Sequence, residues 1–436
     1  MLNNSQTMLT KSQRGLPLRQ ASEAKAKFKT MVATVNKPVK ILLYDRYLLF
    51  ATLTVILLGL MMVYSASIVI SEKMYGGPFH FVLRQGVFIL LGIALALVVV
   101  RISIQRWQAV GGKLLLISLF LLFIVLIPGV GRSVNGSMRW LGFGGLGFQV
   151  SEFAKFAVII YMARYLVLHK HAVREQFSGF MRPMLLLLVM ALLLLKEPDF
   201  GSTTVIFTTA LALLFLGGAQ LWQFTVLFSS VVGAMIVLAI SSPYRMARLT
   251  GFLNPWANPY DSGYQLTQSL IAFGRGGFLG VGLGDSIQKL FYLPEAHTDF
   301  LFAVLSEELG VCWGIIVIVL FGTIVYRALM IGKAAEQLGQ AFAAYVCYGF
   351  ALWIALQVFI NIGVNAGLLP TKGLTLPLMS YGGSSVMIMC VVFAMLMRID
   401  YENRLSRYGL NKKVIRQRLH YAKRSFDKSA EPLKES

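Results

Sequence analysis

Carboxylates gather in one stretch of a chain that otherwise has few of them. Residues 293–310, LPEAHTDFLFAVLSEELG, contain these titratable side chains: Glu295, His297, Asp299, Glu307 and Glu308. An apolar run resumes at Phe300, so Asp299 lies at the mouth of a hydrophobic segment, where water and a lipid head group both reach it. A carboxylate there has the chemistry of a general base that takes a proton from a hydroxyl. The alternative is a helix cap, because the helix dipole stabilises a carboxylate in a first turn.

The neighbouring acidic residues have a more structural interpretation. If a helix begins near Asp299, Glu307 lies about 12 Å deeper at a rise of about 1.5 Å per residue. Ionisable groups at that depth are costly in lipid and face a protein interior or a wet cavity. We therefore expect these carboxylates to be partners of Arg or Lys side chains. The supporting residues of this stretch are Glu295, His297, Glu307 and Glu308.

A lysine inside an apolar segment is the next candidate. Glu152 and Lys155 lie three residues apart at the start of the run 151–169, where they can pair on one helix face. An intramembrane cation with few partners is a functional hint. Lys155 is therefore a candidate for binding an anionic group, with Glu152 in support, and a plain salt bridge is the alternative. Arg139 and Trp140, upstream, form a pair typical of an interfacial anchor.

The last loop of the chain also offers an anion site. In residues 365–385, NAGLLPTKGLTLPLMSYGGSS, Lys372 is the only charge. Ser384 and Ser385 precede the next apolar run, so free backbone N–H groups of a helix start would lie near the lysine. Caps and turns explain the same residues equally well.

A glycine-rich run in the long loop superficially resembles a phosphate cradle. The run is GRGGFLGVGLG, residues 274–284, and no strand precedes it, so the signal is weak. Its Arg275 is still a candidate to meet an anion, as is Arg248 upstream. The turn KEPDFGST, with Asp199, is more typical of a helix cap than of a catalytic site.

These residues together indicate one class of reaction. Cations at Arg248, Arg275, Lys372 and Lys155 would surround a carboxylate at Asp299, which suits an anionic lipid head group. A diphosphate leaving group needs such cations as its charge develops. A divalent cation, Mg²⁺ or Mn²⁺, is a further candidate at the diphosphate, with Asp299 and Glu295 helping to hold it. No other cofactor or resident metal is expected.

The composition places these residues in a membrane. Of the 436 residues, 57% are hydrophobic and only 14% are charged, against about 25% charged in a typical soluble domain. The net charge of +21 lies mostly in the two tails and in alternate loops, so it follows the positive-inside rule and does not indicate a nucleic-acid partner. The three cysteines fall inside apolar runs and form no disulfide framework.

We predict an all-α polytopic membrane protein with ten spans. A basic tail, 1–46, precedes a membrane domain, 47–400, with a large outer loop at 242–298, and a second basic tail follows at 401–436. An even number of spans with both tails cytoplasmic satisfies the charge rule. The loop is too aromatic for a solvated linker, so it should fold against the outer membrane surface with a short helix near 263–273. The predicted spans are 47–68, 79–100, 112–128, 151–169, 182–196, 200–217, 220–241, 299–327, 341–363 and 384–400.

At these residues the sequence resembles a known family. NPWANPYDSGYQLTQSLIAFGRGGFLGVGLG, LPEAHTDFLFAVLSEELG and GLLPTKGLTLPLMSYGGSS are similar to the signature segments of the SEDS family (shape, elongation, division and sporulation). The likeness extends from about residue 44 to 408 and is closest to the division branch. One segment departs from the family pattern RFQPSE, because Gly147 replaces the arginine and Val150 the proline. Lys155 is then the nearby cation left for the diphosphate.

The resemblance implies a peptidoglycan glycosyltransferase that polymerises lipid II at the outer face of the cytoplasmic (inner) membrane, at the division septum. It implies that Asp299, in the motif HTDF, is the essential aspartate. It also implies a class B penicillin-binding protein, the transpeptidase, as partner, and activation by other membrane proteins of the division machinery. Two alternatives stay open, a lipid II flippase and a scaffold that only recruits the transpeptidase. A transporter would place its polar groups near the midplane, so the polar motifs on the outer side favour the enzyme.

Overall fold

In the computed structural model, Tyr44–Asp400 forms one compact unit. The described residues are 44–134, 137–143, 146–240, 252, 254–261, 263–370 and 373–407. The fold and the site below belong to this unit.

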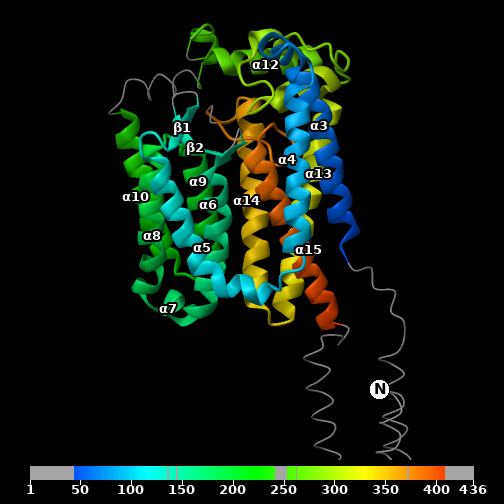
Figure 1. The fold of residues 1–436 in the computed structure, drawn as a ribbon. Helices are drawn as coiled ribbons and strands as arrows, with labels where there is room; N and C mark the ends of the chain where they lie inside the picture. Colours follow the sequence, from blue (N-terminus) through cyan, green and yellow to red (C-terminus); the bar gives the residue numbers. More distant parts are fainter. Residues whose placement is uncertain are drawn as a thin grey trace, which may run out of the picture. The chain divides into compact units, whose positions relative to one another are not determined.

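Ten apolar helices coincide with the ten predicted spans (Figure 1). Seven of them are long and apolar enough to cross a membrane by length and composition alone. Of the others, α6 carries Glu152, Lys155 and Arg164, and α9 has 17 residues. The ten helices are α3 (Arg46–Tyr75), α4 (His80–Val99), α5 (Ile104–Val125), α6 (Val150–Leu168), α8 (Phe177–Lys196), α9 (Phe200–Leu216), α10 (Leu221–Ile240), α13 (Leu301–Gln337), α14 (Ala341–Asn365) and α15 (Gly383–Arg407).

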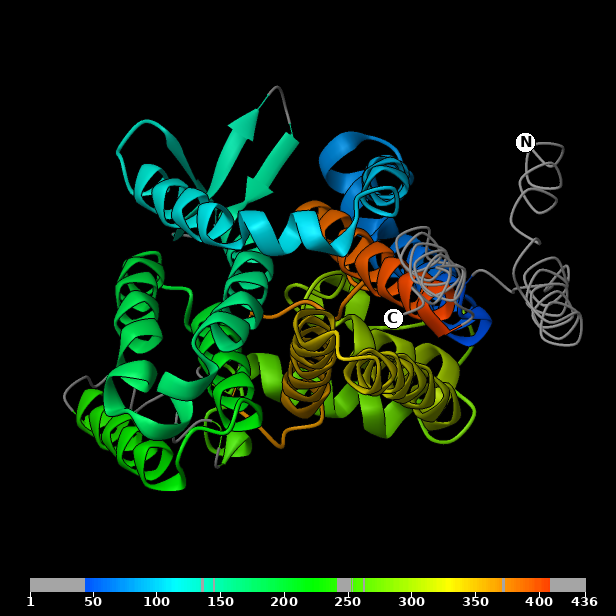
Figure 2. The same cartoon turned by 90° about the horizontal axis from the view of Figure 1, so that it is seen from below.

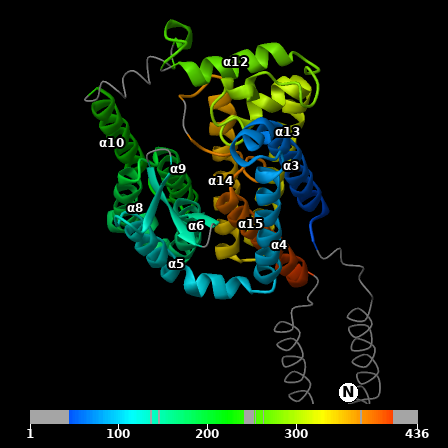
Figure 3. The ribbon, with the colours of Figure 1, turned by 45° about the horizontal axis from the view of Figure 1, so that its top comes forward.

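Shorter elements occupy the connections. The short helix expected near 263–273 is α12, Tyr264–Gly276, preceded by the 3₁₀ turn η1, Pro255–Ala257, and followed by η2, Gln288–Tyr292. On the opposite end of the bundle, α7, Lys170–Glu175, joins α6 to α8 (Figure 1). Helix α12 and the sheet described next lie at the same end of the bundle, which we call the site end (Figures 1 and 3).

A small antiparallel sheet joins α5 to α6, where we expected only a loop. Its strands are β1 (Gly131–Val134), β2 (Ser137–Phe143) and β3 (Leu146–Gln149), in the order β1-β2-β3. Trp140 of β2 pairs with Arg132 on one side and with Gln149 on the other. The Asn-Gly pair at 135–136 is the sequence signal for such a hairpin. The sheet brings β2, and Arg139 with it, to the site end.

Helix α6 lies at the centre of the packing. Its Phe156, Ile159 and Ile160 belong to a hydrophobic cluster with α3, α13, α14 and α15. Its Val158, Met162 and Leu166 belong to a second cluster with α5, α8 and α9. The view from below shows α6 with α5, α9 and α14 beside it (Figure 2). A helix buried against protein on both sides can carry charged residues that a lipid-facing helix could not.

The backbone of α13 is broken at Gly310, where φ is +80° and ψ is 174°. In an unbroken helix the N–H groups of residues 311 and 312 would donate to the carbonyls of residues 307 and 308. Here those carbonyls accept from Val281 N and Gly282 N, both at 3.0 Å. The freed N–H groups of Val311 and Cys312 donate to the carbonyls of residues 277 and 278, at 3.0 and 3.3 Å. The glycine-rich run is thus inserted into the break of α13, which explains its glycines without a phosphate.

A pair of glycine variants tests this insertion. A Cβ at Gly276 would lie 1.9 Å from the carbonyl oxygen of Ser306, whereas a Cβ at Gly274, in the same helix, meets nothing within 4 Å. We expect Gly276→Ala to destabilise the protein by about 1–3 kcal/mol or more, as overpacking does. Gly274→Ala should be neutral or raise stability by up to about 1 kcal/mol. Thermal unfolding in detergent compares the two, and equal melting temperatures would contradict the close packing of α12 on α13.

Candidate active site

Asp299 lies in the turn directly before α13, and two asparagines of α14 hold its backbone. Asn361 Nδ2 and Asn365 Nδ2 donate to the Asp299 carbonyl at 2.9 and 3.0 Å. Asn365 Oδ1 also accepts from Ala303 N at 3.1 Å. The turn is therefore fixed to α14 while the Asp299 side chain stays partly exposed. The sequence signal for this role is the pair of amides four residues apart in an apolar run.

The structure does not support the capping alternative for Asp299. Helix α13 begins at Leu301 with Phe300 at the N-cap position, and the N-cap residue makes no side-chain capping bond. The side chain that reaches a first-turn N–H group is that of Asn365, which accepts from Ala303 N. The carboxylate instead faces the segment before α15, since a Cβ built on Gly373 would lie 3.1 Å from Asp299 Oδ2. Asp299 is thus placed beside the last loop of the chain.

Burial and neighbouring carboxylates raise the pKa of Asp299 from 3.8 to about 7. Burial is the largest cause, Glu295 adds to it, Arg139 opposes it and Asp199 adds again. A carboxylate with a pKa near 7 is matched to proton transfer at neutral pH. The electrostatic environment of Asp299 therefore suits a general base.

Glu295 shapes the turn that carries Asp299. Its backbone adopts φ +56°, which is unusual for a residue other than glycine. The Glu295 carbonyl accepts from Thr298 N and Phe300 N at 3.1 and 3.2 Å, and its Oε2 accepts from Thr298 Oγ1 at 2.6 Å. Strained backbone of this kind persists only where its surroundings fix it.

His297 connects the turn to two other elements. Its ring lies 4.8 Å from the Phe81 ring of α4 and 5.5 Å from the Tyr381 ring, centroid to centroid. Its carbonyl accepts from Tyr381 N at 3.0 Å. Burial lowers the pKa of His297, although Glu295 opposes this shift. His297 is accordingly neutral and packs the turn against α4 and the segment before α15.

Lys155 and Glu152 form the ion pair that their spacing predicts. Lys155 Nζ lies 2.8 Å from Glu152 Oε1, and both side chains are buried. The ammonium also donates to Gln357 Oε1 at 3.2 Å, and it lies 5.3 Å from the Trp353 ring centroid. Gln357 Nε2 donates to the Thr375 carbonyl at 2.9 Å. Through Gln357, the pair connects α6 and α14 to the loop that faces Asp299.

The two serines at the start of α15 bond to the fold itself. Ser384 Oγ accepts from Gln149 N at 2.8 Å and donates to the Gly147 carbonyl at 3.2 Å, so it joins α15 to strand β3. Ser385 is buried, and its hydroxyl accepts from Thr375 Oγ1 at 3.5 Å. A Cβ at Gly147 would lie 3.1 Å from the Trp140 ring. These contacts favour the caps-and-turns interpretation of the serines.

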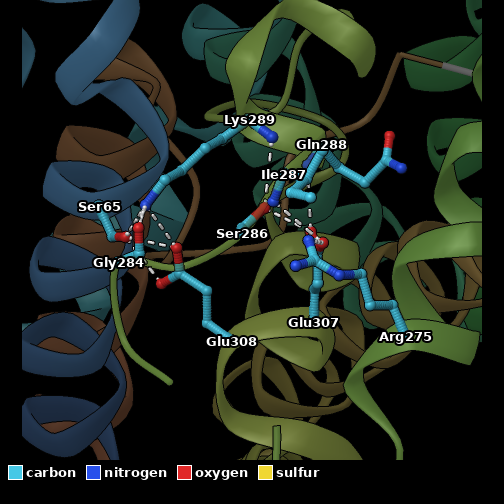
Figure 4. Close-up of polar contacts among 9 residues, drawn as sticks. All are labelled: Ser65, Arg275, Gly284, Ser286, Ile287, Gln288, Lys289, Glu307 and Glu308. Carbon is cyan, nitrogen blue, oxygen red and sulfur yellow. Dashed lines mark hydrogen bonds and ion pairs between the residues drawn. The ribbon is translucent and has the colours of Figure 1, made fainter. Parts of the chain in front are cut away.

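Glu307 and Glu308 each join α13 to the segment that follows α12 (Figure 4). Glu307 Oε1 accepts from Arg275 Nη1 at 2.8 Å and from Ile287 N at 3.1 Å, and Ser286 Oγ donates to Oε2. The expectation that Glu307 pairs with a cation is confirmed. Arg275 is 35% exposed at its side chain and is committed to this carboxylate.

The partner of Glu308 is Lys289, which sequence reasoning missed. Lys289 Nζ lies 2.8 Å from Glu308 Oε1, and Ser65 Oγ of α3 donates to the same carboxylate at 2.7 Å (Figure 4). Both charged side chains are buried. The two adjacent glutamates thus fix the 275–289 segment to α13 from its two ends.

Arg139 contributes to the site in a way that its interpretation as an interfacial anchor does not explain. Its Nε donates to the Glu197 carbonyl at 2.9 Å and its Nη2 to the Pro198 carbonyl at 2.7 Å. The guanidinium therefore holds the α8–α9 turn rather than the membrane interface. It is also the described cation that lowers the pKa of Asp299. The sheet, absent from our prediction, is what brings Arg139 there.

The α8–α9 turn adds two buried acidic residues. Asp199 caps α9 as expected, because its Oδ1 accepts from Ser202 N at 3.1 Å. Glu197 is fully buried, and neither of its carboxyl oxygens has a hydrogen-bond partner. Burial and then Asp199 raise the pKa of Glu197 to about 8, with Arg139 opposing. The Glu197 carboxyl is thus mostly protonated, and so uncharged, at neutral pH.

Two of the predicted cations, Arg248 and Lys372, lie outside the described residues. Within the described part of the chain, no group of three or more His, Cys, Asp or Glu side chains could hold a metal ion by itself.

The fold and this site define a class of protein: a polytopic helical membrane protein with a partly buried carboxylate site at one end of its bundle. The family whose model matches residues 46–405 is described as cell cycle protein and groups FtsW, RodA and SpoVE. The chain belongs to this family, and the resemblance found in its motifs is confirmed.

Curated relatives are similar over most of their length. One from Legionella pneumophila, named probable peptidoglycan glycosyltransferase FtsW, is 55% identical over 376 residues, covering 86% of this chain and 95% of the relative. A relative of the same name from Coxiella burnetii is 54% identical over 359 residues, covering 82% and 96%.

Solved structures share the fold. A chain from a structure described as structural coordination of polymerization and crosslinking by a peptidoglycan synthase complex has a TM-score of 0.67 and 26% identity, covering 83% of this chain and 99% of that one. The rod shape determining protein RodA of Thermus thermophilus has a TM-score of 0.62 and 26% identity, covering 83% and 98%.

Proposed function

We propose that this chain is a peptidoglycan glycosyltransferase that polymerises lipid II during septal wall synthesis. The observation that carries the proposal is the Asp299 carboxylate, which has a pKa of about 7 and a backbone fixed by Asn361 and Asn365. The curated relatives carry the same activity in their names. The site end, by the positive-inside rule, faces away from the cytoplasm.

In the mechanism, Asp299 removes the proton of the acceptor hydroxyl on one glycan end. The hydroxyl oxygen then forms a bond to the sugar carbon that carries the lipid diphosphate, and the bond from that carbon to the diphosphate oxygen breaks. The sugar carbon is inverted, the lipid diphosphate leaves, and the proton stays on Asp299 Oδ until water takes it. General-base catalysis of this kind contributes about 10²–10⁴ in rate.

Cations stabilise the charge that develops on the leaving diphosphate. We assign this task to Lys372 and Arg248, and add Arg139, whose positive charge reaches Asp299. Arg275 and Lys155 are also candidates, although each is bonded to a glutamate in this structure. A Mg²⁺ or Mn²⁺ ion fits this donor set, since Mg²⁺ is usually bound by one or two carboxylates together with substrate phosphates. Asp299 and Glu295 would hold it beside the diphosphate.

The partner and the location follow from the same proposal. A class B penicillin-binding protein would crosslink the strands that this chain makes. The structural relative comes from a structure whose description names polymerization and crosslinking by a peptidoglycan synthase complex, which supports such a partner. Other membrane proteins of the division machinery would activate the pair. Both basic tails would lie in the cytoplasm, and the protein would act at the septum of the inner membrane.

The pH dependence of polymerisation tests the general base. The active form of Asp299 is deprotonated, so the rate should fall tenfold per pH unit below an apparent pKa of about 7. Glu295→Gln removes a negative charge that raises this pKa, so the acid limb should move to lower pH. Asp261→Asn, an exposed carboxylate in the same loop, should leave the profile unchanged. An acid limb that stays in place in Glu295→Gln would contradict the electrostatic argument.

The function itself is tested with fluorescent lipid II and the purified complex of this chain with its transpeptidase, with penicillin present to block crosslinking. Glycan polymer is the expected product. Transport of lipid II across proteoliposomes, without polymer, would instead support a flippase. A transpeptidase that needs the chain for recruitment, with neither polymer nor transport, would support a scaffold.

A further inference from the structure

The most exposed large apolar side chains beside α13 belong to the glycine-rich run, and they continue a lipid-facing surface. Phe278 and Leu279 are 79% and 85% exposed. The Phe278 carbonyl accepts from Cys312 N at 3.3 Å, so the run lies directly against the start of the second half of α13. The α13 residues that follow on the same helix are also exposed and apolar, among them Trp313 and Ile315.

The depth of this contact follows from the charges of α13. Glu308 and Arg327 bound a stretch, residues 309–326, that contains no charged residue. At about 1.5 Å per residue the stretch is about 27 Å long, close to the hydrocarbon thickness of about 30 Å. Gly310 therefore lies at the hydrocarbon boundary, and Cys312 lies just inside it. Phe278, which contacts Cys312, is at the same depth.

Irregular backbone survives at membrane depth only where its polar groups are satisfied. Several backbone groups of the run are satisfied through its insertion into α13. Val281 N and Gly282 N donate to helix carbonyls, the carbonyls of residues 277 and 278 accept from helix N–H groups, and Gly280 N donates to the Gly276 carbonyl at 2.8 Å. The stretch Gly276–Gly284 also contains no charged side chain.

The flanks of the run explain why it stays there. Arg275 is bonded to Glu307 on one side, and Lys289 is bonded to Glu308 on the other (Figure 4). The two ion pairs neutralise the charges nearest to the boundary, where an unpaired charge is costly. The run is thus anchored at both ends while its tip faces outward.

We propose that Gly276–Gly284 is a re-entrant segment that places Phe278 and Leu279 among the acyl chains of the adjacent leaflet. The ligand class is the lipid hydrocarbon of the bilayer, and the surface is continuous with the lipid-facing side of α13. This inference concerns the loop and the membrane, and it does not depend on the reaction proposed for Asp299.

Spin-label accessibility in lipid nanodiscs tests the segment in the full chain. The exposed Cys312 would take up the label, so every variant carries Cys312→Ser. The Cys312→Ser protein, which keeps only the buried Cys347 and Cys390, is the control for background labelling. A nitroxide is attached at Leu279→Cys. Tyr260→Cys, 91% exposed in the same loop, is the water-facing control, and Ile315→Cys, 54% exposed on α13, is the lipid-facing control.

The Leu279 label should collide often with oxygen, because oxygen partitions into lipid. It should collide with a water-soluble nickel chelate several-fold less often than the Tyr260 label does. Its accessibility should therefore match that of the Ile315 label. Nickel accessibility equal to that at Tyr260 would overturn the proposal. A Leu279 label that is accessible to nickel in lipid alone and protected only after the transpeptidase is added would also overturn it, in favour of a protein interface. An unchanged melting temperature of each labelled variant shows that the label reports on the native fold.

Discussion

Asp299→Asn is expected to abolish glycan polymerisation while leaving the protein folded. The amide cannot accept the proton of the acceptor hydroxyl, so the rate should fall by about 10²–10⁴. The fold should tolerate the change because the contacts that hold the turn go to the Asp299 carbonyl, not to its carboxylate. The measurement is polymer yield from fluorescent lipid II, with thermal unfolding and binding to the transpeptidase as controls for integrity.

A matched variant separates the loss of a base from the loss of a negative charge. Asp261→Asn removes an exposed carboxylate from the same loop and should polymerise at the wild-type rate. If Asp299→Asn is equally stable and still makes polymer, the base lies elsewhere, and Glu295 or Glu307 becomes the candidate. Glu307 is the weaker of these, because its carboxylate is fully buried and accepts from Arg275 and two backbone N–H groups.

Lys155→Met is expected to destabilise the protein strongly. It leaves Glu152 buried without its cation, and breaking a buried pair in this way costs about 3–5 kcal/mol. The double variant Lys155→Met/Glu152→Gln removes both charges and should recover most of the lost stability. Thermal unfolding in detergent measures both effects. Lys113→Met, an exposed lysine on α5, is the control for the loss of one positive charge.

The activity of the double variant decides between two roles of Lys155. The ammonium is buried and bonded to Glu152 and Gln357, so we expect the stable double variant to polymerise within about tenfold of wild type, the scale of one moderate interaction. A stable double variant without activity would mean that Lys155 binds the diphosphate directly. If the double variant stays as unstable as Lys155→Met, the unpaired charge of Glu152 is not the cause of the lost stability.

How far the sequence predicts the site differs from residue to residue. Asp299 and the Lys155–Glu152 pair are recognisable because their signals are local: a carboxylate at the edge of an apolar run, and opposite charges one helical turn apart. The local sequence predicts an interfacial anchor for Arg139 and not its role at the site, because its partners Glu197 and Pro198 lie almost sixty residues away. Lys289 has partners 19 and 224 residues away, Glu308 and Ser65 of α3, so its local sequence does not indicate them either.

The glycine-rich run is a case in which the local sequence indicates a site that the structure does not support. Its composition is that of a phosphate-binding loop, and only the contact with α13 reveals that the glycines permit close approach of two backbones. A Cβ at Gly280 would lie 2.2 Å from the Glu308 carbonyl oxygen, and one at Gly310 would lie 2.3 Å from the Phe278 carbonyl oxygen. Apart from the glycine itself, the local sequence contains nothing that would predict either contact.

The sequence by itself determined the ten helices, because a segment in lipid must be apolar over about 20 residues and must satisfy its own backbone. It also determined the position of the carboxylate at the mouth of α13. The tertiary structure alone decided what surrounds that carboxylate and its turn: Arg139 from the sheet, which lowers its pKa, and the asparagines of α14, which hold its backbone. These contacts join elements far apart in the chain, so they depend on how the helices pack and not on the residues next to Asp299.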